Sequence, residues 1–107
     1  MPPWLALLLA GLLEIAWALG LKYSDGFTRL WPSVSTAVAI PLSFLFLGLS
    51  LKSVPFGTAY AVWTGIGAAG AVVIGMLLFG ERADPFRVAC LVLIVAGIVG
   101  LKLATPH

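Results

Sequence analysis

Four long runs of apolar residues, separated by short polar segments, dominate the chain. They span approximately residues 4–21, 33–51, 57–79 and 86–104. The length of each run is close to the roughly 20 apolar residues that a membrane-crossing helix requires. The segments between them contain turn-forming sequences such as Ser24-Asp25-Gly26 and Asp84-Pro85. The pattern predicts an all-α membrane protein with a single four-helix transmembrane domain over residues 1–107.

The amino-acid composition supports a membrane protein and argues against several classes of function. Hydrophobic residues make up 62% of the chain and charged residues 9%, whereas soluble domains carry about 25% charged residues. The first run is unlike a cleaved signal peptide because it lacks a basic start and contains an acid. The short loops hold no metal-ligand cluster, nucleophile with a base or phosphate-binding loop, so we expect no enzyme, no metal and no cofactor. The basic residues form no run that would suggest a nucleic-acid partner.

The basic residues are divided almost evenly between the two membrane faces. Four crossings place both termini on one face. The division is four against two, with Lys22, Arg29, Arg82 and Arg87 on one side and Lys52 and Lys102 on the other. Such a bias is weak for setting orientation and is compatible with insertion in either direction. Two copies could then pair as an antiparallel, dual-topology homodimer with inverted symmetry.

Glu14 is the only acidic or basic residue within the apolar core of any run. An acid at the centre of a membrane helix costs about 2.5–3.5 kcal/mol on insertion scales, and such acids face a bundle interior or a water-filled cavity. We therefore predict that Glu14 binds protons, cations or both, the alternative being a polar bond that fixes helix packing. Burial favours the protonated carboxyl and a docked cation favours the ionised one, so the two would compete. If only loaded states change conformation, this competition yields antiport.

A pocket is expected around Glu14. Its candidate residues are Gly11, Trp17, Ser43, Tyr60 and Trp63. Gly11 and Trp17 share the face of the acid on the first helix, and the Trp17 N–H can donate to the carboxylate. Ser43 can donate to it as well, or can bond a backbone carbonyl of its own helix. Tyr60 and Trp63 either present π-faces to a cation or anchor the third helix at the membrane interface.

Small residues in the third and fourth runs suggest helix contacts. Gly67 belongs to a series of small residues spaced by four, which lets membrane helices approach closely. Gly65 and Gly67 lie in one turn and can also let the third helix bend as a hinge. Cys90 and Gly97 lie seven residues apart on one face of the fourth helix, where they are expected to contact a second copy. Because Cys90 is the single cysteine, an internal disulfide is excluded.

Three segments resemble the small multidrug resistance family of four-helix exporters, and the resemblance covers the whole chain. They are residues 13–17 (LEIAW), 22–32 (KYSDGFTRLWP) and 57–67 (GTAYAVWTGIG). Trp17, three residues after the acid, and residues 57–61 resemble the guanidinium-exporter branch more than the polyaromatic-cation branch. One departure lies in the fourth helix, where Cys90 precedes Gly97 at a spacing at which the multidrug branch often has two glycines.

The resemblance implies an antiparallel homodimer in the bacterial inner membrane that exchanges guanidinium for protons. It implies that Glu14 is the shared proton and substrate site, and that Trp17 and Ser43 are its hydrogen-bonding partners. Tyr60 and Trp63 would line the pocket, with Gly11 beside the acid. Two other functions remain open: export of quaternary ammonium or other lipophilic cations, and a noncatalytic role as a subunit of a heteromeric membrane complex.

Overall fold

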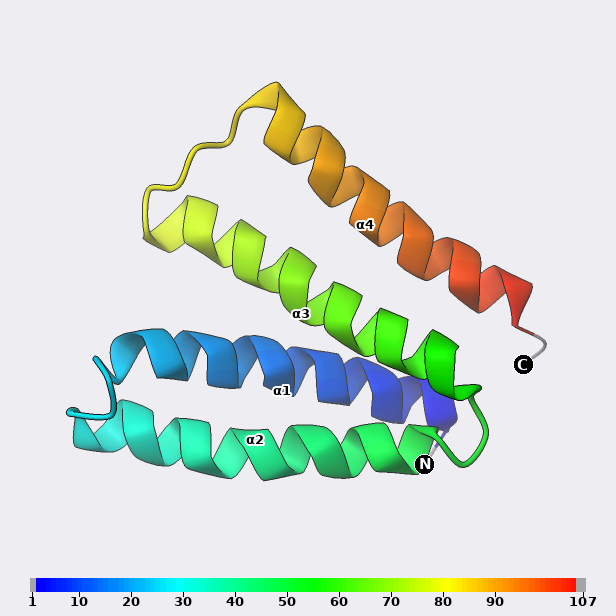
Figure 1. Cartoon of the computed structure of the whole chain (residues 1–107), viewed down its shortest axis with the longest axis horizontal. Helices are drawn as coiled ribbons and strands as arrows, with labels where there is room; N and C mark the ends of the chain where they lie inside the picture. Colours follow the sequence, from blue (N-terminus) through cyan, green and yellow to red (C-terminus); the bar gives the residue numbers. More distant parts are fainter. Residues whose placement is uncertain (1, 106–107) are drawn as a thin grey trace.

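The computed structural model describes residues 2–105, which form four α-helices (Figure 1). The helices are α1 (Pro3–Tyr23), α2 (Leu30–Ser50), α3 (Phe56–Leu78) and α4 (Pro85–Ala104). Each is long and apolar enough to cross a membrane. The predicted all-α membrane fold with four helices is confirmed, and the helix ends differ from the expected ones by at most three residues.

The largest difference lies at the start of α2, which begins at Leu30 instead of residue 33. Arg29 precedes it in an extended conformation, and Pro32 is accommodated within the first turn. A proline is tolerated there because the first backbone N–H groups of a helix have no acceptor within it. Pro41 lies inside α2, which continues to Ser50 without a break. The helix therefore carries Ser43 in regular register beyond the proline.

The helices lie side by side in one layer, in the order α2, α1, α3 and α4 (Figure 1). The molecule measures 43 × 35 × 17 Å, so the layer is about half as thick as it is wide. α1 packs against both α2 and α3, whereas α4 packs against α3. The two ends of the described chain lie at one end of the layer, and the connections around residues 24–29 and 79–84 lie at the other (Figure 1).

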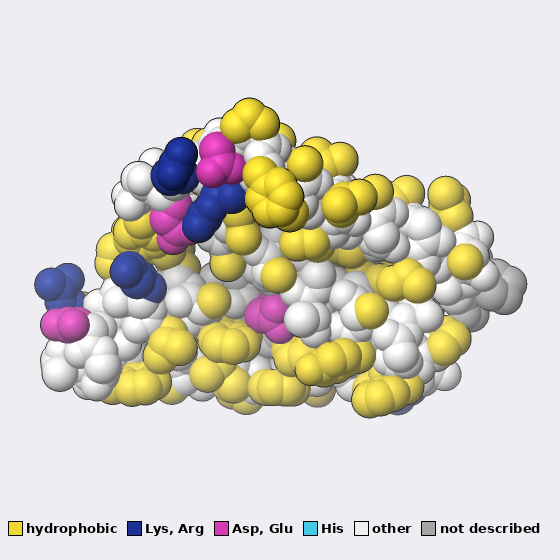
Figure 2. Space-filling model, turned by 45° about the horizontal axis from the view of Figure 1, so that its top comes forward, with side chains coloured by type: hydrophobic (Ala, Val, Ile, Leu, Met, Phe, Trp, Pro, Cys, Tyr) yellow, Lys and Arg dark blue, Asp and Glu magenta, His cyan; other side chains and the backbone are white. Residues whose placement is uncertain are grey.

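Buried side chains concentrate where α1 meets α2 and α3. Leu7, Ala10, Val62 and Trp63 belong to one buried cluster in this region, and α4 contributes no buried residue. Much of the remaining surface is apolar, as the hydrocarbon core of a bilayer requires (Figure 2). Charged side chains gather at the end that carries the 24–29 and 79–84 connections (Figure 2). The fold thus buries the first half of α1, up to Gly11, between its neighbours, and Glu14 follows directly after this buried part.

Candidate functional site

Glu14 lies in the middle of α1, on the side that faces α3. A Cβ atom added at Gly67 of α3 would overlap the Oε1 atom of Glu14, so the carboxylate rests directly against the backbone of that helix. Gly67 is buried and Glu14 is partly buried. Figure 2 shows acidic surface among apolar side chains in the middle of the molecule, away from the charged end. The carboxylate is therefore supported by α3 and is still open to a ligand.

Two further close approaches hold α1 against α3 on either side of Glu14. A Cβ atom at Gly11 would come within 2.6 Å of the Ile66 side chain, and one at Gly70 would overlap the Ile15 side chain. Glycines that admit a large neighbour are typical of closely packed membrane helices. The position of the acid relative to α3 is thus fixed by interlocking side chains one turn before it and immediately after it.

Ser43 joins three helices beside the acid. Its Oγ donates a hydrogen bond of 2.8 Å to the Ala10 carbonyl of α1 and accepts one of 3.0 Å from the Nε1–H of Trp63 in α3. Ser43 is fully buried and Trp63 is 7% exposed, so both groups are removed from solvent. Because Ala10 lies one turn before Glu14, these two bonds fix the turn of α1 that leads to the acid.

The expected hydrogen bonds from Ser43 and Trp17 to Glu14 are not present in this structure. The Ser43 hydroxyl donates instead to the Ala10 carbonyl of α1. The alternative expectation, a bond from Ser43 to a carbonyl of its own helix, is therefore not met either. The Trp17 Nε1 atom is buried and has no partner among residues 2–105. A buried donor without an acceptor costs about 1–3 kcal/mol, so Trp17 holds an unused N–H near the acid. Its contact with a bound cation, and that of Ser43, stay predictions.

Four aromatic side chains form a continuous row beside Ser43. The ring centroids are separated by 6.2 Å between Phe56 and Tyr60, by 5.9 Å between Tyr60 and Trp63, and by 5.2 Å between Trp63 and Phe44. Tyr60 is 53% exposed and Trp63 is buried, so the row leads from the surface to the Ser43 junction. Phe44 was not among the predicted pocket residues. Its place directly after Ser43 is the one signal that the sequence offers for it.

The remaining predicted residues lie on or beside α4. A Cβ atom at Gly65 would come within 3.0 Å of Ile98 of α4, and α3 is uninterrupted at this point. Cys90 and Gly97 are exposed, and a Cβ atom at Gly97 would meet nothing within 4 Å. The hinge role of Gly65 and Gly67 and the contact of Cys90 and Gly97 with a second copy stay predictions.

Glu14 has no cationic partner among the residues that the structure describes. The ion pairs there lie at the charged end, with 3.8 Å between Arg82 and Asp84 and 3.6 Å between Arg87 and Glu81. No cluster of three metal-binding side chains occurs among residues 2–105. A carboxylate in apolar surroundings can take up a proton, or can pair with a cation that brings its own N–H donors.

Four membrane-crossing helices, with an acid that has no ion-pair partner among residues 2–105 in the middle of the first, are typical of a small membrane transporter. The model of the Small Multidrug Resistance protein family matches residues 2–94, and the chain belongs to this family. Proteins named Guanidinium exporter from Escherichia coli (strain K12), Citrobacter freundii and Salmonella typhimurium are each 59% identical to it over 102 residues. These matches cover 95% of this chain and 97% of each relative. The family resemblance is confirmed, and the chain is a multi-pass protein of the bacterial inner membrane.

Proposed function

We propose that this chain exports guanidinium in exchange for protons by alternating access, with Glu14 as the site that proton and cation share. The observation that carries the proposal is the Glu14 carboxylate at mid-helix, which packs against Gly67 and has neither a hydrogen bond from another side chain nor a cationic partner within residues 2–105. The name of relatives that are 59% identical supports guanidinium as the cargo.

Guanidinium suits this carboxylate on chemical grounds. It is a planar, delocalised cation whose N–H groups match the two oxygens of a carboxylate, as the side chain of arginine does. The cation brings N–H donors to a carboxylate that accepts no hydrogen bond from another side chain among residues 2–105, and pairing neutralises both charges before they cross the apolar layer. The exposed face of Tyr60 and the row that leads to Trp63 add π-surfaces for a cation that approaches the site.

Exchange follows from the competition at one group. An ionised, empty Glu14 is the costliest state to place in the apolar layer, whereas the protonated and the cation-loaded states are both neutral. If only neutral states change conformation, each inward proton is matched by an outward cation. The hydrogen bonds of Ser43 with Ala10 and Trp63 support this scheme. They hold the turn of α1 before Glu14 in place while the proton and the cation replace each other on the carboxylate.

The working unit in this proposal is an antiparallel homodimer. A single layer of helices leaves the partly buried Glu14 on an open face, and α4 has no buried residue within its own chain. A second copy in the opposite orientation would enclose the site and use the exposed face of α4 that carries Cys90 and Gly97. Tagging the C-terminus tests this arrangement, because detection on one membrane side only would contradict it.

Reconstituted vesicles provide the test of exchange. A proton gradient should drive guanidinium uptake by the protein alone, and Glu14→Gln, which keeps the size but cannot be ionised, should reduce this uptake to the background of empty vesicles. Glu14→Asp keeps an ionisable group and serves as the matched control, with partial activity expected. Undiminished guanidinium transport by Glu14→Gln would reject the proposal.

A second candidate is export of quaternary ammonium cations, which is favoured by the aromatic row with its exposed Tyr60. Such cations lack N–H donors and would depend on aromatic and apolar walls. Transport of tetramethylammonium without transport of guanidinium in the same vesicles would favour this function. Transport only after addition of a second membrane protein would instead favour a subunit role.

A further inference from the structure

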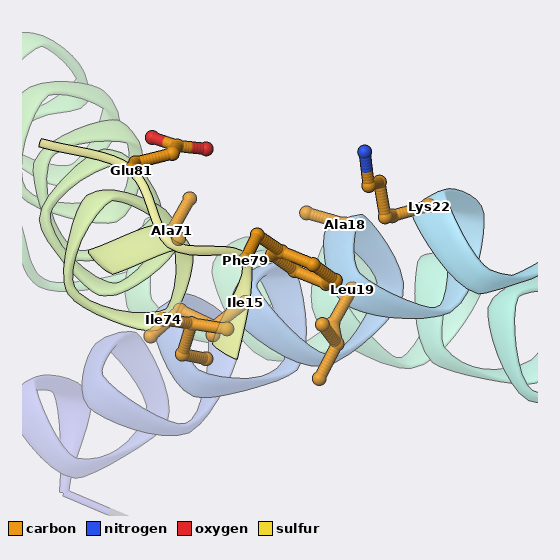
Figure 3. Close-up of a pocket in the computed structure, with 9 residues that line it drawn as sticks. Ile15, Ala18, Leu19, Lys22, Ala71, Ile74, Phe79 and Glu81 are labelled. Carbon is orange, nitrogen blue, oxygen red and sulfur yellow. The ribbon is translucent and has the colours of Figure 1, made fainter. Parts of the chain in front are cut away.

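A cavity of about 160 Å³ lies between α1 and α3, nearer to the charged end than Glu14. Its inner wall is apolar and includes Ile15 and Ala18, which are the residue after Glu14 and the residue one turn beyond it. Its rim carries Lys22 and Glu81 on opposite sides, with Phe79 between them (Figure 3). The cavity therefore extends from the charged end of the molecule to Ile15, the residue that follows Glu14 in α1.

Two cationic side chains of the protein itself, those of Lys22 and Arg87, occupy the rim of the cavity. The Nζ atom of Lys22 lies 5.1 Å from the centroid of the Phe79 ring, in the geometry of a cation–π contact. The guanidinium of Arg87 lies 3.6 Å from Glu81 Oε1. An aromatic face and a carboxylate at the mouth thus bind an ammonium and a guanidinium group of the protein itself. Both groups are on flexible side chains that a free cation can displace.

The Glu81 carboxylate is held in place by the end of α3. A Cβ atom at Gly75 would come within 2.6 Å of Glu81 Oε2, so the carboxylate lies close against the helix at a position that glycine keeps open. The backbone N–H of Glu81 also donates a hydrogen bond of 3.1 Å to the Gly75 carbonyl. The backbone of Glu81 is therefore tied to the end of α3, and its carboxylate lies against the same turn of that helix, at the rim of the cavity.

We propose that Glu81 and Phe79 form an outer site for guanidinium, where the cation binds before it reaches Glu14. The inference rests on the proposed function for the identity of the passenger. The cation replaces the Arg87 guanidinium on Glu81 and the Lys22 ammonium on Phe79, and then moves along the cavity past Ala18. A cavity of 160 Å³ is sufficient for a cation of four heavy atoms with accompanying water, since one water occupies about 30 Å³ in the liquid.

Competition by Arg87 and Lys22 keeps this site weak, which a transport pathway requires. A transported cation has to bind to each site on its pathway tightly enough to enter and weakly enough to dissociate again. The side chains of Arg87 and Glu81 are 49% and 50% exposed. Half-exposed ion pairs are weak, so the outer site raises the local concentration of guanidinium without trapping it.

Transport kinetics test the site. Glu81→Gln should raise the KM for guanidinium about two- to fivefold, as expected for one half-exposed ion pair, and leave the maximal rate unchanged. Arg87→Gln removes the competing guanidinium and should lower the KM. Asp84→Asn is the matched control because it removes the same charge from the same connection and asparagine caps a helix as well as aspartate does. An equal rise in KM for Glu81→Gln and Asp84→Asn would overturn the proposal, since it would indicate a general surface-charge effect.

Binding without transport provides an independent test. In the Glu14→Gln protein, millimolar guanidinium chloride should shift the amide NMR signals of Gly75 and Phe79 relative to sodium chloride of the same concentration. The shifts should disappear in the Glu14→Gln/Glu81→Gln double variant. Shifts that persist in the double variant, or that are absent from Glu14→Gln, would overturn the outer site. If the wild-type protein transports no guanidinium but these Glu81-dependent shifts occur, the proposed function fails and the outer site stands.

Discussion

Replacing Gly67 with alanine places a methyl group where the Glu14 carboxylate now lies. The added Cβ would overlap Oε1 and would lie 2.8 Å from the Cγ atom of Glu14, so a rotation of the carboxylate alone cannot relieve the overlap. Favourable carbon–carbon contacts are about 3.5–4.0 Å, so the end of the side chain has to move by roughly an ångström. Inserting a methyl group into such a contact costs about 1–3 kcal/mol. If that cost falls on the cation-loaded state, guanidinium affinity decreases about 5- to 150-fold.

Calorimetric titration of guanidinium into the purified protein measures this loss directly. Gly48→Ala is the matched control because it adds the same methyl group to α2 at a position with nothing within 4 Å. Alanine is the better helix former by about 1 kcal/mol, so the control is expected to be neutral or slightly stabilised. Equal guanidinium affinities for Gly67→Ala and Gly48→Ala would refute the inference that the ligand-binding carboxylate is seated on Gly67.

Three other substitutions test the structure around the site. Ser43→Ala leaves the buried Trp63 N–H without its acceptor and should lower the free energy of unfolding by about 1–3 kcal/mol, measured by denaturant titration in detergent; an unchanged value would contradict the Ser43 junction. Gly20→Ala brings a Cβ atom within 2.5 Å of Thr36 Oγ1 and should lower the free energy of unfolding by about 1–3 kcal/mol in the same assay; a variant as stable as the wild type would contradict this close approach of α1 and α2. Gly97→Leu fills an open position on α4 and should reduce energy transfer between labelled copies in vesicles; unchanged transfer would remove Gly97 from the dimer contact.

Much of the fold follows from hydropathy, because a bilayer demands long apolar helices whatever their partners. The same logic singled out Glu14, since an isolated acid in an apolar run is costly, and small-residue spacing directed attention to Gly67. These features depend on local sequence and on the properties of the membrane. They could therefore be predicted without knowing how the helices pack.

The hydrogen bonds of the site could not be predicted in the same way. Ser43 has one proton to donate, and whether it goes to Glu14 or to the Ala10 carbonyl depends on the register of α2 against α1. The unpartnered N–H of Trp17 depends equally on which groups the neighbouring helices bring near it. The Glu81 carboxylate packs against Gly75 because the chain turns back on the end of α3. Hydrophobic periodicity predicts helices but not the path of such a connection, so this contact could not be predicted.

The shared use of Glu14 can be measured as protons released when guanidinium binds to the purified protein in weakly buffered solution. The account predicts release approaching one proton per cation while the carboxyl is protonated, with affinity rising about tenfold per pH unit and levelling off once the carboxylate is ionised. Glu14→Gln should release none. Guanidinium binding without proton release at every pH, or equal release by wild type and Glu14→Gln, would contradict it.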